Sequence, residues 1–149
     1  MKWVPLAFLA FLSTGASASI NARIAFKNFE RAKIVVVVSV ENTSERDMCI
    51  NSAALGISGE TSDPLFNVER DGKQLSYLGV REIRSSQSVR SFVVLMPHQE
   101  LSVTHNITSQ FDFSSSGHYK VTYDTLSIGH CLGEGGGLEL RSNVLEFKK

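Results

Sequence analysis

The sequence predicts an all-β domain in which antiparallel strands form a sandwich. Short segments rich in β-branched and aromatic residues recur along the chain, turn-forming residues separate them, and no stretch shows a convincing helical period. Several short strands with turns between them are typical of two packed sheets. The chain has 149 residues, of which 42% are hydrophobic and 20% charged, as expected for one globular domain.

The first 18 residues are typical of a signal peptide. Lys2 supplies a short positive region, residues 4–12 are mostly apolar, and Ala16-Ser17-Ala18 matches the small-residue pattern of a cleavage site. The apolar run is about half the roughly 20 residues that a membrane-spanning helix needs. We expect cleavage after Ala18, which would leave residues 19–149 as a single secreted or periplasmic domain without stable membrane insertion. An uncleaved N-terminal anchor is the alternative.

The strands follow one another at short intervals. Residues 33–40 contain four consecutive valines, and such a run fits a central strand that is buried on both faces. Residues 101–107 alternate apolar and polar side chains, as in a half-buried strand. Residues 48–62 have a mixed pattern that fits no strand clearly, and residues 51–55 could form one turn of helix. The expected strands are residues 22–29, 33–40, 65–68, 74–78, 91–96, 101–107, 117–123 and 138–147.

Two local patterns refine this prediction. Asp71-Gly72 lies between two expected strands, and this pair favours the positive φ angles of a type I′ hairpin. Gly117, Tyr119 and Val121 form the pattern G-x-Y-x-V, which resembles the tyrosine corner of Greek-key sandwiches, where the hydroxyl bonds to backbone a few residues upstream. We therefore expect an immunoglobulin-like Greek-key antiparallel β-sandwich of seven to eight strands, with a structural role for Tyr119.

Cys49 and Cys131 are the two cysteines of the chain, and both lie beyond the expected signal peptide. An exported chain enters an oxidising compartment, where an even pair usually forms a disulfide. The bridge would close a loop of about 83 residues, which the chain-entropy model equates with about 4–5 kcal/mol of stability. Two free buried thiols are the alternative.

No sequence motif marks a catalytic residue, a metal ligand or a cofactor site. The chain lacks H-E-x-x-H, G-x-S-x-G and the glycine patterns that bind phosphate. Lys+Arg and Asp+Glu both number 15, so no basic excess favours nucleic acid. These absences predict a protein that is not an enzyme, holds no cofactor and acts by contact. The four histidines lack metal-ligand spacing: His98, His105, His118 and His130.

Residues 80–90 (VREIRSSQSVR) are rich in arginine and follow Tyr77 closely. Tyrosine and arginine are enriched at protein interfaces. We therefore expect an exposed Tyr77 to contact a protein partner together with Arg81 and Arg84. A solvated loop is the alternative for this segment.

Two segments, residues 65–83 and 92–123, carry a distinctive order of residues. Its members are Phe66, Val68, Arg70, Asp71, Gly72, Leu75, Tyr77 and Gly79, followed by Pro97, Leu101, Phe111, Asp112, Phe113, Ser114, Gly117, Tyr119, Val121 and Tyr123. This order resembles the N-terminal β-sandwich, or pro-region, that precedes the catalytic domain in secreted zinc proteases of the deuterolysin and peptidyl-lysine metalloendopeptidase family.

The resemblance implies a stand-alone relative of that pro-region. The family carries its H-E-x-x-H motif and a further aspartate ligand in a separate C-terminal domain, and the motif is missing here. Pro-regions keep their protease folded or silent, so the resemblance implies a protease inhibitor or pro-region-like protein whose partner is a secreted metalloprotease. The alternative is an extracellular or envelope structural or adhesion module that binds a surface partner or carbohydrate. Loss of Trp3 with the signal peptide counts against carbohydrate, since such sites favour exposed aromatic rings.

Overall fold

The computed structural model describes residues 19–30, 33–57, 64–79, 91–128 and 137–149. Within these ranges the chain is all-β and its strand pairings are antiparallel, as the sequence predicts. The strands are β1 (Ile20–Glu30), β2 (Lys33–Asn42), β3 (Met48–Asn51), β4 (Phe66–Arg70), β5 (Lys73–Gln74), β6 (Phe92–Leu95), β7 (Glu100–Asn106), β8 (His118–Ile128) and β9 (Gly137–Lys148). Among the described residues, no helix has the length and apolar character needed to traverse a bilayer.

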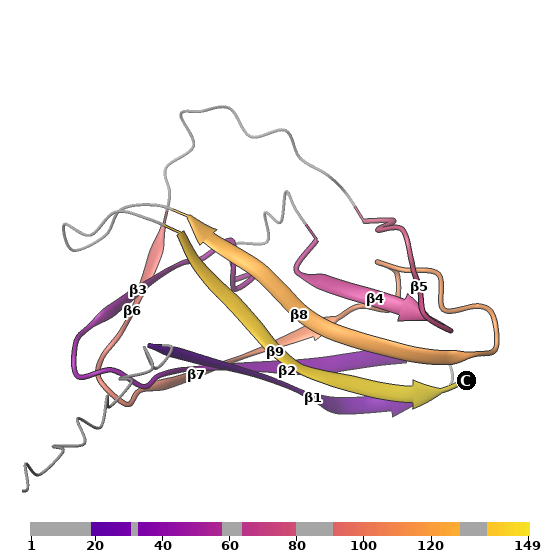
Figure 1. Cartoon of the computed structure of the whole chain (residues 1–149), viewed down its shortest axis with the longest axis horizontal. Helices are drawn as coiled ribbons and strands as arrows, with labels where there is room; N and C mark the ends of the chain where they lie inside the picture. The colour runs from indigo at the N-terminus through magenta and orange to yellow at the C-terminus, as the bar shows by residue number, and fades with distance from the viewer. Residues whose placement is uncertain (1–18, 31–32, 58–63, 80–90, 129–136) are drawn as a thin grey trace, which may run out of the picture.

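Two larger sheets form the layers of the sandwich (Figure 1). One has the strand order β1-β2-β7 and the other β5-β4-β8-β9, while β3 and β6 form a separate two-stranded sheet. The described part of the chain holds nine strands where the sequence predicts seven to eight. The difference arises from β3, within a segment that the sequence pattern leaves unassigned.

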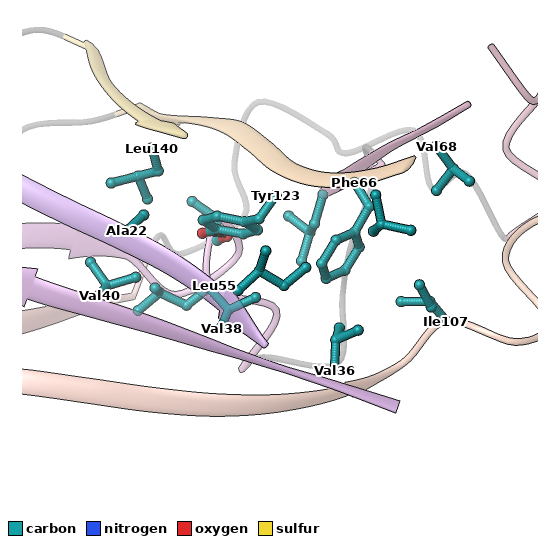
Figure 2. Packing of buried hydrophobic residues seen from close by; sticks show 14 of the residues in the cluster. Ala22, Val36, Val38, Val40, Leu55, Phe66, Val68, Ile107, Tyr123 and Leu140 are labelled. Atoms are coloured by element: carbon teal, nitrogen blue, oxygen red, sulfur yellow. Dashed lines mark hydrogen bonds between the residues drawn. The ribbon is translucent and has the colours of Figure 1, made fainter. Parts of the chain in front are cut away.

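The core lies between the two larger sheets (Figure 2). From β2, Val36, Val38 and Val40 point into it and are at most 2% exposed, facing Tyr123 and Phe66 from the opposite sheet. Strand β2 is central in its sheet, as predicted. Burial on both faces was wrong for most of the strand, however. On the outer face only Val35 is buried, whereas Val37 and Ser39 are half-buried, because this sheet packs against the other on one face.

The hairpin between β4 and β5 has the predicted turn. Asp71 has a φ of 50° and Gly72 a φ of 77°, the two positive values that a type I′ turn requires. The second strand is much shorter than the predicted 74–78, since pairing stops after Gln74. The Asp71 carboxylate accepts a hydrogen bond from the His118 N–H (2.9 Å), which ties the turn to the start of β8.

A β-bulge in the β8–β9 pair shapes one corner of the sandwich. The register shifts between Thr122 and Asp124, so the Tyr123 N–H turns to the Ser142 hydroxyl (3.0 Å) instead of a backbone carbonyl. The next residue, Asn143, reaches across to β1 and bonds to the backbone of Ile24. Ser142 therefore satisfies an N–H that the irregular ladder leaves free, and Asn143 satisfies the outward-facing groups of Ile24 on the edge strand β1.

Tyr119 occupies the position expected of a tyrosine corner. Its side chain is fully buried, and its hydroxyl donates a hydrogen bond to the carbonyl of Ser115, four residues upstream (2.6 Å). Its ring stacks on Phe147 of β9 with 5.0 Å between centroids and 8° between planes. Tyr119 thus connects the loop before β8 to the core.

Candidate functional site

Two neighbouring grooves are formed by residues that include Gln74 of β5 and the C-terminal Lys149. Strand β5 and the C-terminus lie at the same end of the sandwich (Figure 1). They have volumes of about 260 Å³ and about 370 Å³ and share Phe111 as a wall. The first is lined by Pro64, Phe66, Gln74, Leu75, Ser76, Tyr77 and Phe111. The second is lined by Ile34, Leu78, Thr108, Ser109, Phe111, Asp112, Phe113, Ser114 and Lys149.

Tyr77 is half-buried, whereas the sequence predicts an exposed side chain. Its ring packs edge-on against Phe111 at 5.7 Å between centroids, and a side chain at Gly79 would collide with its hydroxyl. The neighbouring Leu78 is instead the exposed apolar residue, with 61% of its surface accessible. The Leu78 N–H is held by the Gln110 carbonyl (2.8 Å). The sequence pattern could not predict that Leu78 is exposed and Tyr77 half-buried, because the residues beyond β5 are not in a strand.

Arg81 and Arg84, the other two predicted partner contacts, lie outside the described residues, as do the expected signal peptide and Cys131. The structure therefore places one of the three predicted contact residues, at the border of a groove. The contact role of all three residues stays a prediction.

The rim of the second groove carries fixed charge. The Asp112 carboxylate accepts hydrogen bonds from the Ser114 hydroxyl and the Ser114 N–H (2.9 Å), and these bonds lower the pKa of Asp112 below its ordinary value, with smaller contributions from Arg70 and Lys149. The Lys149 ammonium donates to the carbonyl of Phe113. An ionised carboxylate and an ammonium thus flank an apolar floor, which suits binding of another surface.

Two titratable side chains within the described residues, Tyr123 and His105, both pack against the ring of Phe66. Tyr123 donates its hydroxyl proton to the Ala54 carbonyl (2.7 Å), and burial raises its pKa. His105 packs edge-on against Phe66 at 5.3 Å, and its buried Nε2 has no hydrogen-bond partner. Burial lowers the pKa of His105 below 6.5. No group of three or more potential metal-binding side chains occurs in the described ranges.

Cys49 is half-buried in β3, where its register partner is Val94. Two residues further on, the Asn51 N–H bonds to the hydroxyl of Ser127 near the end of β8 (2.8 Å). Ser127 precedes Cys131 by four residues in the sequence. This bond places the end of β8 beside β3, and the Cys49–Cys131 bridge stays a prediction.

One comparison with known proteins finds a similarity to part of a protease. The chain is similar to an extracellular protease of Aeromonas hydrophila, with 29% identity over 126 residues. The similarity covers 83% of this chain and 36% of that protease, so the chain spans about a third of the length of its relative. No protein-family model matches the chain. The chain therefore resembles one region of a larger extracellular protease.

Proposed function

We infer that this chain is a non-catalytic, exported binding module that acts on a secreted protease. The observation that carries this proposal is the similarity to 36% of an extracellular protease, which extends over 83% of this chain. The similar region spans 126 residues, which is the size of one domain. The role we propose is that of a protease inhibitor or a pro-region-like protein, in line with the resemblance to the deuterolysin-type pro-region.

The arrangement of side chains supports action by contact. The second groove beside Phe111 has a mainly apolar lining, which includes Leu78 with 61% of its surface accessible. Apolar side chains in a concave surface with a charged rim are typical of protein interfaces. The mechanism we propose is non-covalent occupation of the protease surface, in which no bond is made or broken.

The test uses the exported chain, residues 19–149, and the Aeromonas hydrophila protease to which it is similar. We expect a stoichiometric complex by calorimetry at micromolar concentrations. Addition of the chain should either reduce hydrolysis of a peptide substrate, as for an inhibitor, or raise the yield of active protease after refolding, as for a pro-region.

Substitutions at Leu78 and Arg81, with one at Met96 as the control, test where the protease binds. Leu78→Asp should weaken the complex, because it places a charge on the apolar groove, and Arg81→Ala should weaken it too. Met96→Asp is the control, since Met96 is 59% exposed in the turn after β6 and lines neither groove. If the wild-type chain neither binds the protease nor changes its activity or refolding, the proposed function is wrong.

A further inference from the structure

Among the described residues, no strand pairs with the outer edge of β7. This strand is the last in the order β1-β2-β7, and its seven residues pair with β2 without a bulge. Regular, unpaired edges offer a template on which another strand can add. Natural sheets usually guard such edges with lysine, proline or a bulge, and β7 has none of these.

The register fixes which backbone groups of β7 face outward. The Ile107 N–H bonds to the carbonyl of Ile34 (3.1 Å), so odd-numbered residues of this segment direct their N–H and C=O groups toward β2. In an antiparallel pair, the backbone N–H and C=O groups of successive residues point alternately toward the partner strand and away from it. The N–H and C=O groups of Glu100, Ser102 and Thr104 therefore point away from the sheet. Within the described part of the chain these outward groups have no backbone partner.

At the opposite edge of the same sheet, on β1, outward backbone groups have hydrogen-bond partners. The outward groups of Ile24 on β1 are covered by the side-chain amide of Asn143. In the part of the chain that the structure describes, no side chain bonds to the outward backbone groups of Ser102 or Thr104, which are small and exposed. Beside them, Leu101 and Val103 turn toward the core yet stay half-buried, so an added strand would shield them further.

The charges along this edge are self-complementary. Near Glu100, Arg23 is shared between Glu100 (2.7 Å) and Glu41 (3.5 Å), which leaves that end negative. Near Thr104, the Lys27 ammonium approaches the threonine hydroxyl (3.4 Å), which makes that end positive. A second copy running antiparallel would bring the negative end of one edge to the positive end of the other.

We propose that two copies of this chain pair through β7, with Ser102 on the two-fold axis. Ser102 then faces Ser102 of the second copy, and Glu100 faces Thr104 beside Lys27. Leu101 packs against Val103 across the interface, on the core-facing side. Each of the three facing pairs with outward groups exchanges two backbone hydrogen bonds, about six in total. The result is one continuous sheet through both copies, an interaction independent of the protease.

The first test measures association by sedimentation equilibrium from about 10 μM to about 1 mM. The wild type and Ser102→Ala should both dimerise, because alanine keeps the outward N–H. Ser102→Pro removes that N–H without touching the ladder to β2, and should weaken dimerisation about tenfold or more. Thr104→Glu, which sets two carboxylates opposite each other, should also weaken dimerisation and replaces the proline variant in the test if that variant fails to fold.

The second test fixes the register. Facing residues whose backbone groups are paired lie about 5.5 Å apart at Cα, within the range of a disulfide. Ser102→Cys should therefore form a covalent dimer under mild oxidation, and Thr104→Cys, whose counterpart is Glu100, should not. A wild type that stays monomeric, a Ser102→Pro variant that dimerises like wild type, or equal cross-linking of the two cysteine variants would each overturn the proposal. None of these outcomes bears on protease binding.

Discussion

The side-chain amide of Asn143 satisfies both backbone groups that Ile24 directs away from β2. The Ile24 N–H donates to Oδ1 (3.0 Å), and Nδ2 donates to the Ile24 carbonyl (3.2 Å). Residues 24 and 143 are 119 apart in the sequence. One side chain on β9 therefore closes the edge of β1 and joins the two sheets at that corner.

Replacement of Asn143 by alanine should lower the free energy of unfolding by about 1–3 kcal/mol, because it leaves an N–H and a carbonyl of β1 without their partner. Urea unfolding measures the change. Asn21→Ala is the control, since Asn21 lies on the same strand with an exposed side chain, and its effect should be within about 0.5 kcal/mol. Equal effects of the two substitutions would show that the amide contacts add no stability.

Removal of the Tyr119 hydroxyl by Tyr119→Phe should cost about 1 kcal/mol, since the bond to the Ser115 carbonyl is lost while the ring stays in place. Tyr77→Phe provides the matched control, because no hydrogen bond of the Tyr77 hydroxyl is present among the described residues. Thermal unfolding of both variants separates the tyrosine-corner bond from a general effect of removing a phenol oxygen. A loss at position 77 as large as at 119 would contradict this role.

Stability should fall in mildly acidic solution because of His105. Burial lowers the folded-state pKa of His105 below 6.5, so the unfolded chain takes up a proton at a higher pH than the folded chain does. The stabilising contribution is complete above about pH 6.5 and decreases as the pH falls toward the folded-state pKa.

Urea midpoints at about pH 8 and about pH 5 measure this dependence. His105→Gln, which cannot titrate, should show a smaller difference between the two midpoints than wild type. An unchanged difference would mean that other groups cause the loss.

The predicted Cys49–Cys131 bridge is tested by counting thiols in the unfolded, unreduced exported chain. We expect no titratable thiol, and Cys49→Ser should lower stability by up to about 4–5 kcal/mol in the chain-entropy model. Two titratable thiols would refute the bridge. Reduction of the wild type serves as the control, and it should reproduce the loss seen in the serine variant.

Local pattern predicted most of the strands and the β4–β5 turn. The β-branched run in β2 and the alternation in β7 are each long enough to show a period, and Asp71-Gly72 requires a specific backbone conformation. Strand β3 has four residues and β5 has two, too few to show a period.

The candidate site was predicted less well, because its geometry depends on distant residues. Tyr77 is half-buried because Phe111, 34 residues further along the chain, supplies a ring against it. The exposed Leu78 and the grooves follow from the same packing. The open edge of β7 likewise depends on which strands assemble beside it, which the alternation of its own residues does not specify.

The positions of the three tyrosines allow intrinsic fluorescence to report on binding and unfolding separately. Two phenols, those of Tyr119 and Tyr123, are sealed in the interior and bonded to carbonyls, whereas that of Tyr77 borders an open groove. In the exported chain predicted from the sequence, cleavage after Ala18 would remove Trp3, the single tryptophan, and ultraviolet emission would come from these three rings. A ligand that binds beside Phe111 would then change the fluorescence of Tyr77 and leave that of Tyr119 and Tyr123 unchanged. Binding and unfolding would therefore give different emission spectra without an attached dye.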